Sequence, residues 1–221
     1  MMPKTSPIVT TNLVMNLDAS NPSSYSGSGV NWFDISGSSN NGLLVNSPTF
    51  NTANGGNIVF DGTDDHVTTS LLPTKLEFTI SIWVKLSETL NGDNLCVDDG
   101  AGYLGLGFYT TTNKIRMSTF DTLAKFAEST NVINTNQIYN FVGTYKGNET
   151  TKLYINGAFD SQSGAALSAT GIGLNTTPLK LFKNGSFYAK GNLYQILLYS
   201  RAITATEVLE NFNATKSKFG L

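Results

Sequence analysis

Residues 137–159 read QIYNFVGTYKGNETTKLYINGAF, and the Asn156-Gly157 pair near the end of this stretch decides the fold class. An Asn-Gly pair between two alternating runs is typical of a β-hairpin, because both central residues of a type I′ turn need positive φ. A second pair, Asn184-Gly185, stands between another two short runs of this kind. The two hairpins predict antiparallel sheets.

A further run, residues 78–85 (FTISIWVK), alternates between apolar and other residues with period two. The apolar residues at its even-numbered positions are expected to face the core. Trp83 falls on the opposite face of the same strand. We expect that face to be either covered by loops or available to a ligand.

The composition favours strands and turns over helices. The 221 residues include 13 Phe, 9 Tyr and 21 Gly, and only 14% of residues are charged. Aromatic residues suit pleated sheets, and Gly supplies turns. No linker divides the chain, and all-β domains of this length are common. We predict an N-terminal arm over residues 1–11 and one all-β domain over residues 12–221.

One helix is predicted, near the C-terminus. Thr204 and Glu207 have the spacing of a capping box, in which the two side chains bond each other's backbone amides. Val208, Leu209 and Phe212 then fall on one helical face. The pattern predicts a short amphipathic helix over about residues 205–214, packed against the strands.

Charge and apolar runs exclude several classes of partner. The formal net charge is −2 and the pI is near 5.3, whereas a protein that binds nucleic acid normally carries a basic face. No apolar run is long enough for membrane insertion, and the N-terminus lacks the apolar stretch of a signal peptide. A single cysteine, Cys96, excludes an internal disulfide framework.

Four segments, taken in order, resemble the concanavalin A-like (laminin-G-like) jelly rolls. They are residues 58–62, 82–84, 137–157 and 191–204, of which the last resembles the closing strand of that family. The resemblance covers about residues 12–214. It implies an all-β fold of two antiparallel sheets packed face to face, a jelly-roll sandwich with the short helix at its C-terminus.

Two details refine the resemblance. Residues 16–37 are similar to versions of this domain in phage and large-virus structural proteins. Where the family commonly carries an acidic pair in the closing strand, this chain has Tyr194 and Gln195, which argues against a metal site there.

Some relatives with this fold are glycoside hydrolases, which need two carboxylates flanking the scissile bond. The alternating acidic run that such sandwich hydrolases carry on one strand is missing here. Glu149 stands in a predicted turn, and Glu207 and Glu210 stand on the predicted helix. The single histidine, His66, has no evident catalytic partner. We therefore predict a protein that is not an enzyme.

Calcium is the one cofactor that the acidic residues suggest. Asp61, Asp64 and Asp65 surround a glycine turn, and Asp98 belongs to a second acidic loop. Calcium prefers oxygen ligands of this kind. The alternative is that these residues are solvated turn carboxylates, since Asp is favoured in turns.

Aromatic residues near polar loops are candidates for stacking on a sugar ring. We select Trp83, Tyr103, Tyr109 and Tyr188, together with Asp121, as ligand-binding residues. Loops held by a rigid sheet concentrate binding residues, and residues 93–103 and 121–128 form such loops in the predicted fold.

These patterns lead to a functional expectation. We expect a non-catalytic virion structural or appendage protein, which adheres to host surface glycan or to neighbouring virion proteins. Weak sites favour multivalent display, so a homotrimer or higher oligomer is expected. The alternatives are a bacterial surface carbohydrate-binding or adhesion module and, less favoured, a glycoside hydrolase.

Overall fold

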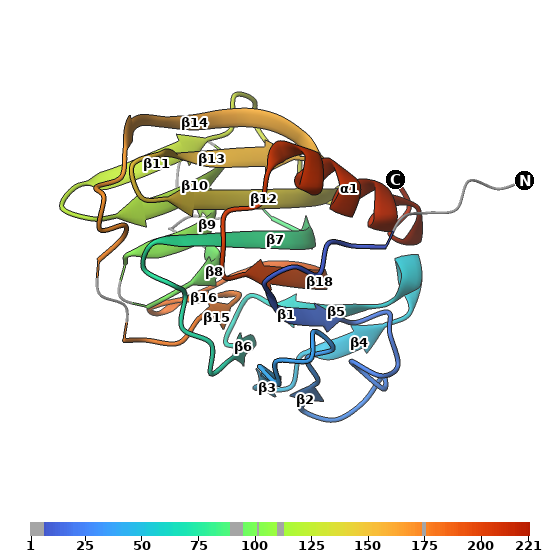
Figure 1. Ribbon diagram of the computed structural model, residues 1–221. Coiled ribbons are helices and arrows are strands. Elements are labelled where there is room, and N and C mark those ends of the chain that lie inside the picture. The colour runs from blue at the N-terminus through green and yellow to red at the C-terminus, as the bar shows by residue number, and fades with distance from the viewer. Residues whose placement is uncertain (1–6, 89–94, 101, 110–112, 174–175) are drawn as a thin grey trace, which may run out of the picture.

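A computed structural model of the chain describes residues 7–88, 95–100, 102–109, 113–173 and 176–221 (Figure 1). Two eight-stranded sheets pack face to face, and the strand pairs between described residues are antiparallel. This arrangement confirms the predicted all-β sandwich.

The first sheet carries the strands that the opening hairpin predicts. In spatial order it contains β14 (Ala158–Ala166), β13 (Thr150–Ile155), β12 (Ile138–Lys146), β7 (Glu77–Leu86), β18 (Lys190–Tyr199), β5 (Asn57–Asp61) and β4 (Thr49–Asn51), with β1 (Leu13–Asp18) also paired to β18.

The second sheet lies behind the first one. Its order is β11 (Ala124–Glu128), β10 (Lys114–Phe120), β9 (Leu104–Tyr109), β8 (Leu95–Asp98), β15 (Lys180–Leu181), β6 (His66–Thr68), β3 (Gly42–Val45) and β2 (Asn31–Trp32). A small hairpin of β16 (Lys183–Asn184) and β17 (Phe187–Tyr188) completes the set of strands.

The core fills the space between the two sheets. The even-numbered residues of β7, from Phe78 to Val84, are buried in it, as the period of two predicts. The sheets approach closely where Gly143 of β12 faces Met117 of β10. A Cβ at residue 143 would lie 2.4 Å from the sulfur of Met117, so a larger residue would force the Met117 side chain to move.

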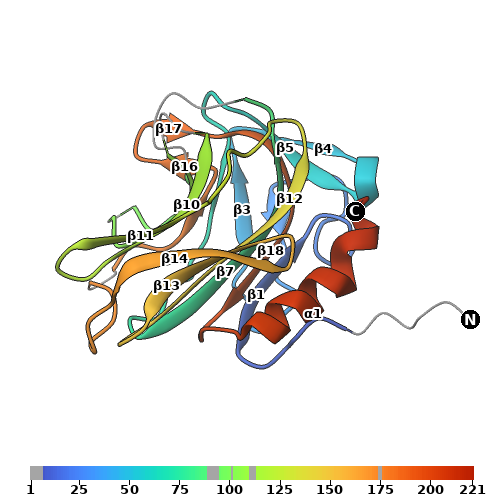
Figure 2. The ribbon, with the colours of Figure 1, turned by 90° about the horizontal axis from the view of Figure 1, so that it is seen from above.

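A helix covers the outer face of the first sheet. It is α1 (Ala205–Thr215), and a 3-10 turn, η2 (Lys216–Lys218), follows it. Figure 2 shows α1 outside the first sheet, on the side away from the β16–β17 hairpin. The predicted capping box is confirmed, since Thr204 accepts from the Glu207 amide and the Glu207 carboxylate accepts from the Thr204 amide. Within the described residues, no helix has the length and hydropathy that crossing a bilayer requires.

Trp83 lies beneath the C-terminal end of this helix. Its ring stacks on Phe212 with centroids 5.5 Å apart, touches Phe219, and donates from Nε1 to Thr215 Oγ1 at 3.0 Å. Only 2% of Trp83 is exposed. This burial does not fit the predicted ligand contact of Trp83, because the C-terminal segment fills the space where a sugar would stack.

The two predicted hairpins differ in outcome. Asn156 and Gly157 have φ of 50° and 80°, as the predicted turn requires. In the second hairpin Asn184 pairs with Phe187, so the turn consists of Gly185 and Ser186. The turn thus lies one residue later than predicted, because Asn184 serves as the last strand residue.

The described part of the predicted arm, residues 7–11, packs on the protein's own domain. The Val9 amide donates to Asn211 Oδ1 at 2.8 Å, and its carbonyl accepts from the Tyr199 hydroxyl at 2.9 Å. Arg201 Nε donates to the Thr11 carbonyl. Residues 1–6 of the predicted arm lie outside the described residues.

Candidate ligand-binding groove

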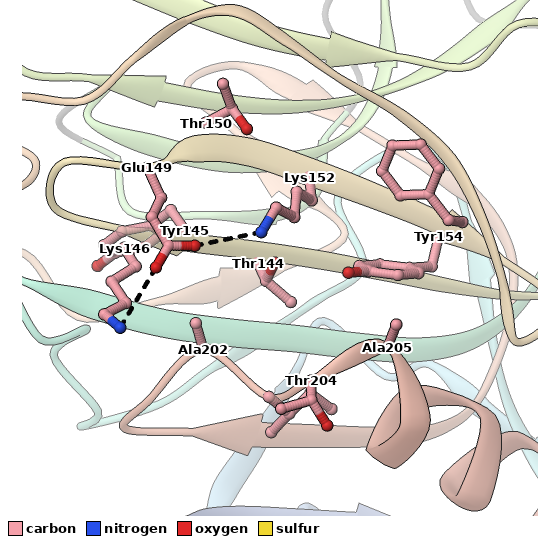
Figure 3. A pocket seen from close by; sticks show the side chains of 12 residues that line it. Thr144, Tyr145, Lys146, Glu149, Thr150, Lys152, Tyr154, Ala202, Thr204 and Ala205 are labelled. Atoms are coloured by element: carbon pink, nitrogen blue, oxygen red, sulfur yellow. Dashed lines mark hydrogen bonds and ion pairs between the residues drawn. The ribbon is translucent and has the colours of Figure 1, made fainter.

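A cavity of about 400 Å³ opens on the outer face of the first sheet, beside the start of α1 (Figure 3). Pockets that hold small ligands have volumes of roughly 300–1,000 Å³. We call this cavity the groove. Its lining residues are Thr144, Tyr145, Lys146, Glu149, Thr150, Lys152, Tyr154, Phe159, Ala202, Ile203, Thr204 and Ala205.

One wall of the groove, residues 202–205, is fastened to the sheet by a buried hydroxyl. Thr79 Oγ1 donates to the Arg201 carbonyl at 2.7 Å and accepts from the Ile203 amide at 3.0 Å. Thr79 pairs with Thr144 across β7 and β12. The connection between β18 and α1 is thereby held beside Thr144, which forms part of the floor.

A charged cluster closes one end of the groove. The Glu149 carboxylate lies 3.3 Å from Lys146 Nζ and 3.2 Å from Lys152 Nζ, as the dashed lines in Figure 3 show. Hydrogen bonds from Lys152 and Lys146 lower the pKa of Glu149. The carboxylate is therefore ionised at neutral pH, and two ammonium groups share one counter-ion.

Tyr154 supplies a hydroxyl that has no hydrogen-bond partner among the described residues. The residue is only 4% exposed, yet within the described chain its hydroxyl makes no hydrogen bond. Figure 3 shows this hydroxyl pointing across the groove. Burial raises the pKa of Tyr154, which keeps the hydroxyl neutral and able both to donate and to accept.

The remaining sides of the groove are polar at the floor and aromatic at the far end. Thr144 is 3% exposed, and its hydroxyl likewise has no hydrogen bond among the described residues. The ring of Phe159 meets that of Tyr154 edge to face at 5.7 Å and is 54% exposed. A ligand with polar substituents around an apolar face would satisfy these groups.

The acidic groups around the groove do not form a hydrolytic pair. Glycoside hydrolysis needs one carboxyl with a raised pKa as acid and a second as base or nucleophile. Among the described lining residues, Glu149 is the only carboxylate, and its pKa is lowered. This geometry is suited to binding a ligand and lacks the acid that hydrolysis requires.

The groove was not identified from the sequence, although eight of its residues stand in the stretch that decided the fold. Four of them, Thr144, Lys146, Lys152 and Tyr154, alternate with core residues there, which marks them as outward-facing. That alternation was the available signal. It could not show that residues 202–205 cross the same face.

The predicted tyrosines belong to the second sheet and its hairpin. Tyr188 accepts a hydrogen bond from Lys183 Nζ at 2.8 Å, and its half-buried ring lies 5.8 Å from that of His66. Tyr103 packs against Phe120 with centroids 6.0 Å apart. Tyr109 ends β9, and its side chain lies outside the described residues, as do residues 93, 94 and 101 of one predicted binding loop. Tyr103 and Tyr188 are not among the residues that line the groove.

Asp121 fastens loops instead of presenting its carboxylate to a ligand. It lies 2.5 Å from Lys125 Nζ and accepts from the amides of Leu123 and Ser168. Burial alone would raise the pKa of Asp121, but Lys125 and these amides outweigh it and hold the pKa well below its usual range. The predicted ligand role does not fit these contacts, because the carboxylate oxygens are already bonded.

The four predicted metal ligands fall into two places. Oxygens of Asp61, Asp64 and Asp65 lie within 4.8 Å of one another, and burial, followed by repulsion from the other two residues, raises the pKa of Asp65. These three could together supply part of the roughly six to eight oxygens that calcium takes. Asp98 is outside that group. It is 2% exposed on β8 and accepts from the Gly100 amide at 2.9 Å.

The family model of the concanavalin A-like lectin/glucanase superfamily matches residues 61–209 of the chain. The matched residues include β12, β13 and β14 and the connection that forms the groove wall. No curated protein sequence shows significant similarity to the chain.

Several solved structures share the fold. A Trypanosoma rangeli sialidase in complex with the inhibitor DANA is 16% identical, with a TM-score of 0.69 over 98% of this chain and 36% of its own. Domain 4 of a GH43 extracellular arabinanase from Geobacillus stearothermophilus, in complex with arabinotriose, is 15% identical, with a TM-score of 0.69 over 90% of this chain and 98% of its own.

A third similar structure is the binding domain of Paraclostridial Mosquitocidal Protein 1. It is 19% identical, with a TM-score of 0.69 over 92% of this chain and 52% of its own. At these identities the likenesses concern the fold. The chain spans about a third of the sialidase and nearly the whole of the arabinanase domain.

Proposed function

The chain belongs to the concanavalin A-like lectin/glucanase superfamily, and from that premise we propose that it is a non-catalytic glycan-binding module whose ligand lies in the groove. The observation that carries this proposal is the Tyr154 hydroxyl, which makes no hydrogen bond within the described chain and is directed into the groove. A sugar hydroxyl in the groove would bond it in place of water, and a hydrogen bond of this kind contributes about 0.5–1.5 kcal/mol.

The neighbouring residues suit a sugar ring in the same orientation. Phe159 offers an exposed ring for the apolar face of a pyranose, while Tyr154 and Thr144 face its hydroxyls. Domain 4 of the arabinanase, solved with arabinotriose, is a precedent for a sugar complex on this fold.

The test is a glycan array probed with the wild type and with Tyr154→Phe, which removes only the hydroxyl oxygen. We expect binding of the recognised glycan to weaken about threefold to tenfold. Phe159→Ala should weaken it comparably by removing the stacking surface. Tyr188→Phe, on the hairpin across the molecule, is the matched control and should bind like the wild type.

Two other outcomes of the same screen would change the conclusion. Binding that Tyr188→Phe weakens and Tyr154→Phe leaves intact would move the site to the second sheet. Release of reducing sugar from a bound oligosaccharide, abolished by replacing a single carboxylate, would make the protein a hydrolase. Repeating the screen with a calcium chelator tests whether the Asp61, Asp64 and Asp65 cluster takes part.

The biological setting that we propose is display on a virion, where the groove contacts host glycan. The similarity of residues 16–37 to phage and large-virus structural proteins supports this setting. We further propose a homotrimer or larger assembly, because several weak sites together bind about 10²–10⁴ times more tightly than one. Light scattering on the purified protein tests the assembly, and a monomer at all concentrations would contradict it.

A further inference from the structure

Two lysines and one carboxylate line one end of the groove. Lys146 and Lys152 both reach Glu149, the single carboxylate among the described lining residues. Glu77 lies beside this end, where it pairs with Lys146 across β7 and β12, but its carboxylate accepts from the Ala202 amide, so the two ammonium groups that line the groove share one lining carboxylate. The Glu149 side chain is 43% exposed and the Lys152 side chain 33%, so both can exchange partners with a ligand.

The wall opposite these lysines contains the start of helix α1. The helix begins at Ala205, which lines the groove, and its cap bonds the Glu207 amide. Amides in a first helical turn favour negative charge, and here the Glu207 carboxylate already supplies it. The helix end alone would not define a site.

The independent observation is a pair of hydroxyls that lack hydrogen bonds. Tyr154 and Thr144 are residues more than nine-tenths buried, they line the same cavity, and they have no side-chain hydrogen bond in the described chain. These hydroxyls favour a polar ligand in the groove, and the two lysines favour a ligand that also carries a negative group.

We propose that the groove selects a saccharide with an anionic substituent, and that the substituent lies between Lys146 and Lys152. This inference rests on the proposed function and adds the class of glycan. The sugar ring lies toward Tyr154 and Phe159, and its negative group displaces part of the Glu149 interaction with the two lysines.

The arrangement predicts whether replacing Glu149 strengthens or weakens the binding of acidic sugars. If the lysines bind the ligand's anion, Glu149 competes with that anion, and its neutralisation in Glu149→Gln strengthens binding of acidic sugars. If Glu149 instead accepted from a sugar hydroxyl, the same variant would weaken the binding of every sugar. The Glu149 backbone bonds to Lys146 and Leu167 are unaffected by this substitution, so the turn is retained.

The experiment compares matched pairs of methyl glycosides by saturation-transfer NMR on the full chain. The pairs are glucoside with glucuronide and galactoside with galacturonide, and galactoside 6-sulfate distinguishes sulfate from carboxylate. We expect the acidic member to bind about threefold to tenfold more tightly. Salt should reduce this preference, because the groups are partly exposed.

Single substitutions distinguish the effect of the Lys152 and Glu149 charges from that of the other groove residues. Lys152→Gln should abolish the preference within each pair, Glu149→Gln should increase it about threefold, and Lys183→Gln on the far hairpin should leave it unchanged. Neutral and acidic members bound equally, with both still weakened by Tyr154→Phe, would overturn this inference and leave the proposed function standing. A preference for acidic sugars that survives Lys152→Gln would also overturn it.

Discussion

At the residue scale, buried polar side chains in this protein are of two kinds. Most have internal partners, as when Trp83 donates to Thr215 or Asn192 donates to Asn57. Tyr154 has none in the described chain and, unlike Trp32 and Ser161, whose buried polar atoms also lack a partner, it lines the groove. Sequence patterns located Tyr154 on a strand but could not reveal its unpaired hydroxyl, because hydrogen bonding depends on neighbours that are distant in the chain.

Asp98 gives a pH-dependent prediction at this scale. Burial raises its pKa from 3.8 to about 6, so the folded state holds the proton more tightly than the unfolded chain does. Its contribution to stability is present below about pH 4 and is lost as pH rises through 6. At about 1.4 kcal/mol per pKa unit, we expect this one group to lower the free energy of unfolding by about 2–3 kcal/mol across that window.

Urea unfolding of the wild type and of Asp98→Asn at several pH values measures this effect. The variant should lack the decline between pH 4 and pH 6, so its stability relative to the wild type rises with pH. Asp64→Asn, at an exposed position, is the control. Parallel pH profiles for wild type and Asp98→Asn would contradict the assignment.

At the element scale, α1 connects the fold to the groove. Its capping box was predictable because the Thr204–Glu207 spacing is local. The residues that the helix covers were not predictable. The alternation of residues 78–85 assigned Trp83 to the outer face of the sheet, but it could not show which segment packs on that face. The second hairpin was displaced by one residue for a similar reason, since an Asn-Gly pair does not state which of its residues ends the strand.

Glu207 fixes the beginning of this helix, and its replacement should destabilise the protein. Its carboxylate binds Arg201 through both oxygens, at 2.8 and 2.6 Å, and accepts from the Thr204 amide. The pairing with Arg201 is the main cause that lowers the pKa of Glu207 to about 2. Its stabilisation is therefore present above about pH 4.5 and is lost as pH falls toward 2.

We expect Glu207→Gln to lower the free energy of unfolding by about 1–2 kcal/mol at pH 7 and by much less near pH 2. Glu210→Gln, an exposed position on the same helix, should change it by less than about 0.5 kcal/mol. Chemical denaturation at both pH values gives the comparison. A deficit of the same size at pH 2 would show that the charge of Glu207 is not what stabilises the helix start.

At the scale of the whole molecule, the two-sheet sandwich was predictable because four segments matched the family in order and residues 78–85 alternate with period two. The groove was not predictable, because it joins residues 144–159 of the sheet to residues 202–205 of a connection far along the chain. Two predicted ligand residues do not fit a ligand contact. Trp83 is buried beneath the C-terminal segment, and the carboxylate of Asp121 is bonded within the protein. The sequence pattern therefore could not predict contacts between segments that are far apart in the chain, and the groove is formed by such contacts.

Binding of the glycan in the groove is tested most directly by amide chemical-shift mapping of the isotopically labelled protein during titration with the glycan that binds best on the array. If the groove is the site, the largest shifts occur at residues 144–154 and 202–205, around the groove. Shifts concentrated on the β16–β17 hairpin and the neighbouring strands of the second sheet, with the groove unchanged, would contradict it.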